Sequence, residues 1–362
     1  MIKNLVPTCL ASLLASLAIM QSLSASLINI DTVTVGDAGN TADTQIMGDS
    51  TTGYGAVNYE YRIGKYEVTI AQYTAFLNAV AATDTYNLYN ADMGTNLNIA
   101  GISRSGSSGS YSYSVIGSGN RPITYVSWFD AARFANWMAN GQPTGAQGNA
   151  TTENGAYSLF GALSGMDFTK NAVNPNTLTT TTWWIPSEDE WYKAAYYKGG
   201  GTTAGYWLYP TQSDSAPGNT IGSGVNQANS AVAGVYAVTQ SSSYLSTQNY
   251  LTDGGAFSGS GSAYGTFDQG GNVWEWNDAV IPTWGGGSAR GLFGSSWDYP
   301  ATDSSFRYYW GPSDENTFFM GFRVASVAES SAVPEPGQIA ASGVLLVGGG
   351  LYWLVRRRRV TR

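Results

Sequence analysis

The side chains that most often carry out chemistry are nearly absent from this chain of 362 residues. It contains no histidine, and its single cysteine, Cys9, lies in an apolar run near the N-terminus. The missing histidines exclude Ser-His-Asp triads, histidine bases and histidine-ligated zinc or copper. Beyond residue 9 the chain also has no thiol for disulfides, thiolate metal sites or nucleophilic catalysis.

Carboxylates are the next candidates for chemistry. Glu188, Asp189 and Glu190 stand together and could act as an acid–base group. They also follow Pro186 and Ser187 in the pattern of a helix start, where acidic residues interact favourably with the helix dipole. We therefore expect these three carboxylates to be structural.

Three helices are predicted from apolar spacing and capping residues. The first spans about 69–80, the second runs from Ser127 to Asn140, and the third begins at Ser187 and ends before the glycines at 199–201. Short aromatic strands are predicted at 59–66, 273–276 and 321–325. The Gly/Ser/Thr-rich stretches 101–118 and 199–262 are predicted to be surface loops.

The composition indicates a loop-rich domain that is held together by aromatic burial. Charged residues make up 12% of the chain, about half the usual share, whereas aromatic residues reach 13% and glycine occurs 45 times. About 300 residues lie between the two ends, enough for one large domain or two small ones. We assign them to a domain at 27–330.

The N-terminus has the layout of a secretory signal peptide. Lys3 is followed by an apolar run from Leu5 to Met20 and by small residues from Ser22 to Ser26. We predict a signal peptide at 1–26, with cleavage near Ala25 or Ser26, and export of the chain.

The C-terminus, 331–362, combines a short motif, an apolar run and a basic cluster. Val333, Pro334, Glu335 and Pro336 precede a membrane span predicted at about 338–355, whose strongly apolar part is roughly 25 Å long at helical rise. The cluster that follows consists of Arg356, Arg357, Arg358 and Arg359. The positive-inside rule places these arginines in the cytoplasm and the main domain outside.

This tail resembles the PEP-CTERM sorting signal of Gram-negative bacteria that make extracellular polysaccharide. The resemblance implies an exosortase-type protease as a partner. It also implies anchoring in the inner membrane before processing, and then a location in the outer envelope or outside the cell. An ordinary single-span anchor is the alternative.

The charge of the exported part argues against some partners. Without Lys3 and the five arginines of the tail, 11 basic residues face 25 acidic ones, a net charge of about −14. Nucleic acids and anionic membrane surfaces are therefore not expected to bind. Extracellular polysaccharide and envelope proteins remain possible partners.

Six blocks in order resemble the sulfatase-modifying-factor family, which includes the formylglycine-generating enzymes. They are YRIGKYEVT at 61–69, RPITYVSW at 121–128, WIPSEDEW at 184–191, GGNVWEW at 270–276, RGLFGSSW at 290–297 and GFRV at 321–324. The resemblance covers about 57–326. It implies an α+β fold, a loop-rich variant of the C-type lectin fold with little regular secondary structure.

The family's defining chemistry is not expected here. Its active members bind Cu(I) through two cysteines after the fifth block, and thiolates suit that soft ion. In this chain the first cysteine position falls near Tyr299 and the second near Ser304 or Ser305. We therefore expect no catalytic residues and no copper. The iron-dependent sulfoxide synthases of the same superfamily need histidines, which are absent.

The resemblance does imply a structural calcium site. The family's ligands correspond to the side chains of Asp268 and Glu275 and to the backbone carbonyls of Gly271 and Val273. Calcium prefers several oxygen ligands in a flexible arrangement. A second family site would include Asn229. A turn followed by a core strand is an alternative explanation of the block, and it is compatible with calcium.

Several residues near the family's substrate groove have two explanations each. Arg307 and Arg323 could line the groove or form structural ion pairs. Trp297 and Tyr308, with the neighbouring Tyr309 and Trp310, could stack on sugar rings or pack in the core.

Three functions remain open. The chain is a non-catalytic binding module for glycan or protein, a purely structural matrix component, or an oxidoreductase that generates formylglycine in sulfatases. The missing cysteines disfavour the last of these.

Overall fold

The computed structural model describes residues 27–165, 168–282, 288–306, 308–310 and 316–328. The predicted signal peptide and the predicted sorting tail, with its predicted membrane span, lie outside these ranges. Within them, no helix is long and apolar enough to cross a membrane.

The three predicted helices are confirmed, and each begins with a capping box. Thr69 caps α1 (Ile70–Val80) together with Gln72. The long helix α3 (Trp128–Ala139) is capped by Ser127 and Asp130, and α4 (Glu188–Tyr196) by Ser187 and Glu190. Glu188, Asp189 and Glu190 thus occupy the first turn of α4, as the structural explanation predicted. A one-turn helix, α2 (Asp92–Thr95), was not predicted.

One four-stranded sheet joins the two ends of the domain. Its order is β1 (Thr32–Val35), β2 (Tyr61–Gly64), β12 (Ala325–Val327) and β7 (Trp183–Trp184), and all its neighbours are antiparallel. Tyr61 lies opposite Val35 on one side and Val327 on the other. The first and last strands therefore both pair with β2.

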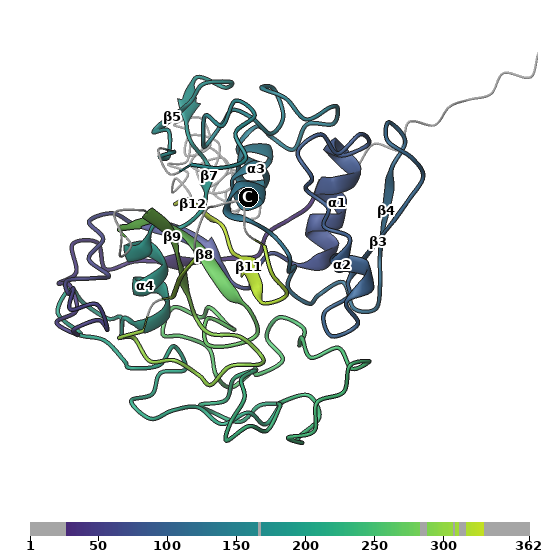
Figure 1. The fold of residues 1–362 in the computed structure, drawn as a ribbon. Helices are drawn as coiled ribbons and strands as arrows, with labels where there is room; N and C mark the ends of the chain where they lie inside the picture. The colour runs from purple at the N-terminus through teal and green to yellow at the C-terminus, as the bar shows by residue number, and fades with distance from the viewer. Residues whose placement is uncertain (1–26, 166–167, 283–287, 307, 311–315, 329–362) are drawn as a thin grey trace, which may run out of the picture.

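A second four-stranded sheet carries the Trp-Glu-Trp block. Its order is β10 (Tyr308–Trp310), β9 (Ser288–Phe293), β8 (Trp274–Pro282) and β11 (Met320–Phe322). The pairing of β8 with β11 is parallel, with Glu275 opposite Gly321. In Figure 1, α4 and α1 lie on opposite sides of these strands.

One of the two predicted loops is wrong and the other is confirmed. Segment 101–118 contains a hairpin of β3 (Ile102–Ser105) and β4 (Ser112–Val115) because Ile102 and Tyr113 are buried against the core. A second, smaller hairpin joins β5 (Val173–Asn174) and β6 (Thr179–Thr180). Segment 199–262 carries only isolated bridges and forms the lower part of Figure 1.

The core is aromatic, as the composition predicted. Phe134 of α3 packs against Phe76 of α1 and against Phe322 of β11, with ring centroids 5.4 Å apart in both pairs. The buried Trp276 donates its indole N–H to the carbonyl of Val126, 2.9 Å away. Such ring contacts contribute beyond the area that they bury, which offsets the small amount of regular structure.

Candidate functional site

A buried ion pair lies at the centre of the molecule. Arg323 follows β11, and its Nε and Nη2 donate to the two carboxylate oxygens of Glu275 on β8 at 2.5 and 2.6 Å. Trp191 of α4 donates its indole N–H to Glu275 Oε2 at 2.8 Å. The remaining guanidinium N–H groups reach the carbonyls of Gly64, at 2.8 Å, and Phe267, at 3.0 Å. Both charged side chains are fully buried.

Asp268 precedes the turn that leads into this strand. Its backbone is left-handed, with φ 62°, and its Oδ2 accepts the N–H of Gly255 at 2.6 Å. Burial is the main cause that raises the pKa of Asp268 to about 6, and Glu275 adds to it. No hydrogen bond within the described ranges reaches Oδ1.

Asn229 lies against the same turn. Its backbone carbonyl accepts the N–H of Asn272 at 2.8 Å, and its amide donates to Asn272 Oδ1 at 3.0 Å. The close approach of Asn229 to the turn requires glycine at 271, because a Cβ there would lie 2.3 Å from the Asn229 carbonyl oxygen. The φ angle of Gly271 is also 107°, which side chains disfavour. The residues predicted for two calcium sites are therefore neighbours in one polar region.

The bonds that Glu275 makes with Arg323 affect the prediction of a calcium site. Both of its oxygens already bond to Arg323, so its charge is compensated, and a cation there would compete with the guanidinium. Within the described part of the chain, no group of three or more His, Cys, Asp or Glu side chains is arranged to hold a metal. Glu275 thus does not fit a metal ligand in this arrangement. Asp268 and the carbonyls of Gly271 and Val273 remain the candidates.

Glu67 belongs to this region but was not predicted as a site residue. It is 3% exposed, and its Oε1 accepts from the amide of Asn272 at 3.2 Å. Burial, and then the charges of Asp268 and Glu275, raise the pKa of Glu67 well above its ordinary value. The sequence signal that could have pointed to Glu67 is a carboxylate between Tyr66 and Val68 in a chain with few charges.

The two predicted cysteine positions lie near Trp274. Its ring centroid is 6.1 Å from that of Tyr299 and 5.9 Å from that of Phe306, the residue after Ser305. Tyr299 is 48% exposed. Ser305 donates its backbone N–H and its hydroxyl to Asp303 Oδ1, at 3.0 and 2.5 Å. Ring and hydroxyl groups therefore occupy the positions at which the sequence resemblance predicts the family's cysteines.

Two of the predicted groove residues, Trp297 and Arg323, have side chains that the structure describes, and both lie in the core. Trp297 is 3% exposed and stacks on Tyr250 at 4.7 Å, with only 4° between the ring planes. Arg323 forms the ion pair with Glu275. Arg307 and the side chain of Tyr308 lie outside the described residues. Trp297 and Arg323 are therefore both buried in the described part of the chain, one in a ring stack and one in an ion pair.

Comparisons with solved structures find matches over most of this chain. The crystal structure of CarF is 21% identical, with a TM-score of 0.51, and the match covers 84% of this chain and 100% of that one. PvdO from Pseudomonas aeruginosa is 18% identical, with a TM-score of 0.46, over 82% of this chain and 94% of that one. A sequence comparison with curated proteins finds no significant match.

The model of the sulfatase-modifying factor enzyme 1-like domain matches residues 33–328. The matched region begins before residue 57, where the resemblance seen in the sequence was predicted to start, and it includes β1. Because it spans most of the chain, the protein belongs to the family of sulfatase-modifying factor enzyme 1-like domains and has their α+β, C-type-lectin-like fold.

Proposed function

We propose that this family member is a non-catalytic binding module for glycan or protein, exported to the envelope or the extracellular matrix. The observation that supports the proposal is the replacement of both copper-binding cysteines, near Tyr299 and Ser305. Methionine is the only soft donor beyond residue 9, and its neutral thioether cannot readily replace two anionic thiolates. The nearest methionine downstream, Met320, is buried in β11.

The test is an oxidation assay. The full chain, purified in a mild detergent, is incubated with Cu(I), oxygen and a peptide that carries the sulfatase cysteine motif. We expect no loss of the thiol and no gain of an aldehyde by mass spectrometry. Copper-dependent turnover above that of a heat-treated sample would instead establish the oxidoreductase function.

A structural matrix component is the second candidate, favoured by the low charge and the long Gly/Ser/Thr-rich loop at 199–262. A binding module and a matrix component differ in their response to ligands. Selective binding on an array of defined glycans supports the module, whereas the matrix role predicts no selectivity.

Export and sorting are proposed from the two chain ends. The supporting features are the signal-like N-terminus and the Val333–Pro336 motif, followed by the apolar run and the arginines 356–359. We propose that an exosortase-type protease processes the tail between Pro334 and Gly337. The intact mass of protein from the cell envelope tests this, because recovery only of chains that retain the arginines excludes processing.

A structural calcium ion is also proposed. Its support is the chemistry of the block that begins at Asp268, where this carboxylate and the backbone carbonyls of Gly271 and Val273 stand close together in sequence.

A further inference from the structure

Two adjoining hollows flank the first described residues of the chain. The first has a volume of about 490 Å³ and the second about 430 Å³. They share Asn29, Ile30 and Asp31, so this short segment forms a ridge between them. Each volume lies in the range of small-molecule sites.

A buried carboxyl group lines the first hollow. Glu67 accepts a hydrogen bond from Asn272 at Oε1, and no hydrogen bond from another described residue reaches its Oε2. Carboxylate oxygens accept hydrogen bonds, so Oε2 is suited to receive a hydroxyl group of a ligand.

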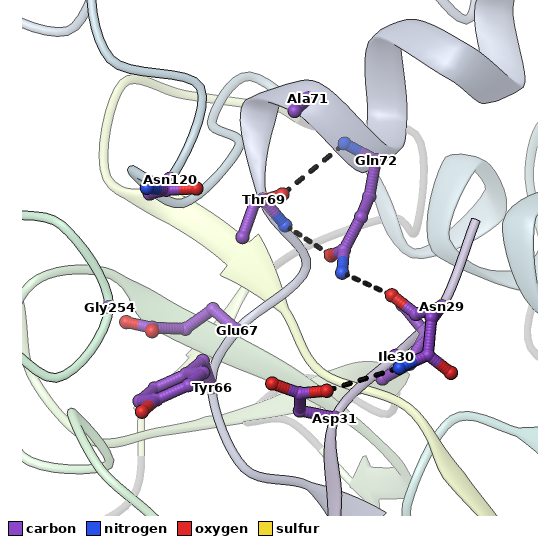
Figure 2. A pocket seen from close by; sticks show the side chains of 10 residues that line it. All are labelled: Asn29, Ile30, Asp31, Tyr66, Glu67, Thr69, Ala71, Gln72, Asn120 and Gly254. Carbon is purple, nitrogen blue, oxygen red and sulfur yellow. Dashed lines mark hydrogen bonds between the residues drawn. The ribbon is translucent and has the colours of Figure 1, made fainter.

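The rim of this hollow is polar and ordered. Gln72 donates its amide to the carbonyl of Asn29 at 2.9 Å, and Asn29 donates its amide to Asp31 Oδ1 at 3.1 Å. Figure 2 shows this chain of hydrogen bonds, with Asn120 and Glu67 around the same hollow. Amide and carboxylate groups are thus held at fixed positions around the buried acid.

An aromatic ring completes the first hollow. Tyr66 packs against the backbone at Gly254 and Gly255, where an added Cβ would lie 3.0 and 2.8 Å from ring atoms. Lys65 Nζ lies 5.4 Å from the centre of the Tyr66 ring and lines the second hollow. That hollow also has an aromatic side chain, Trp183.

This chemistry suits hydroxyl groups better than a metal ion. A carboxyl group, side-chain amides and a fixed ring can bond and stack with a sugar, whose hydroxyls donate and accept. A metal would need converging carboxylates, and no such group of three occurs among the described residues. Two adjoining hollows, each lined by one aromatic side chain, suit two neighbouring sugar units of one saccharide chain.

We propose that the two hollows form one binding site for a saccharide chain of at least two units, which deepens the proposed binding function and rests on it. Glu67 and Asp31 bond hydroxyl groups, and Tyr66 and Trp183 provide the stacking surfaces. None of residues 297–306, the loop with the predicted cysteine positions, lines either hollow.

The test uses the full chain in detergent and an array of defined neutral and acidic tetrasaccharides. The strongest binder is then titrated by calorimetry against Glu67→Gln, which keeps an acceptor for Asn272, and Asp31→Ala, which changes an exposed residue. We expect each variant to bind about fivefold to tenfold more weakly, the effect of one lost hydrogen bond. The matched control is Phe160→Ala, because Phe160 is 68% exposed and lines neither hollow. Its affinity should equal that of the unchanged protein.

Two results would overturn the site. One is the absence of tetrasaccharide binding. The other is binding that Glu67→Gln and Asp31→Ala leave unchanged while Tyr299→Ala weakens it, which would move the sugar site to the 297–306 loop. Neither result affects the proposal that the protein is non-catalytic, because the oxidation assay tests that proposal separately.

Discussion

Arg323 and Glu275 place two opposite charges in the core with no exposure to solvent. Replacing Arg323 with methionine leaves Glu275 buried and uncompensated. We expect Arg323→Met to lower the free energy of unfolding by about 3–5 kcal/mol, as measured by urea denaturation. The comparison is Arg104→Met, because Arg104 pairs with the buried Asp84 but keeps 31% of its own side chain exposed.

Arg104→Met should cost less than Arg323→Met, because Asp84 keeps the hydrogen bonds that it accepts from Leu88 and Tyr89. If both substitutions cost the same, the complete burial of Arg323 adds nothing to the stability that its ion pair contributes.

Calcium binding is predicted to depend on Asp268. A ligand that binds only the folded state raises stability by about 2.7 kcal/mol at one hundred times its dissociation constant. We therefore expect calcium to raise the thermal midpoint, and chelation to reverse the rise. Asp268→Asn should abolish the response while the circular dichroism spectrum is retained.

Asp92→Asn is the matched control, because Asp92 is exposed on the short helix α2. A calcium response that persists in Asp268→Asn would place the ion elsewhere.

The sequence predicted part of this polar region and missed the rest for a physical reason. Asp268 and Glu275 lie in one short block whose resemblance to the family was visible. Glu67 reaches the region only because residues 205 positions apart meet, as its bond with Asn272 shows. The partnership of Glu275 with Arg323 is likewise set by the β8–β11 pairing, which no local pattern encodes.

At the scale of elements, capping chemistry was the most reliable signal. All three predicted helices start at a Ser or Thr whose partner lies three residues on. This pattern is local, so it can be recognised without the fold. The β3–β4 hairpin was missed because its Ser- and Gly-rich sequence is typical of a loop, and only burial of Ile102 and Tyr113 makes it a sheet.

The cap of α4 offers a direct measurement. Ser187 accepts the N–H of Glu190, and Glu190 in return accepts the N–H of Ser187 at 2.7 Å. Ser187→Ala removes the first of these bonds, so we expect a loss of about 1 kcal/mol in urea unfolding. Ser108→Ala, at an exposed serine outside any helix, should change stability by less than about 0.5 kcal/mol. If the two variants lose the same amount of stability, the Ser187 cap does not stabilise α4.

At the scale of the whole molecule, buried acids set the pH dependence of stability. Burial raises the pKa values of Asp130 and Asp278 to about 7, and that of Asp268 to about 6. These values lie above 3.8, so between pH 4 and 7 the folded state binds more protons than the unfolded state. The stability contributed by these groups is therefore complete below pH 4 and falls as pH rises to about 7.

Thermal midpoints measured from pH 5 to 8 should accordingly decrease with rising pH. Asp130→Asn should flatten this slope, because it removes one of the titrating groups. The exposed Asp92→Asn should leave the slope unchanged. A midpoint that rises across this interval would contradict the prediction.

The position of β12 has a consequence for the order in which the molecule is completed. This last described strand lies between β2 and β7, and nearby Arg323 bonds to Gly64 across 259 residues of chain. As the chain leaves the ribosome, the strand that lies between β2 and β7 is missing until residues 325–327 emerge. Contacts this distant in sequence form slowly, and unpaired strand edges invite association in the meantime. Synthesis of the domain must therefore be nearly finished before its first sheet can close.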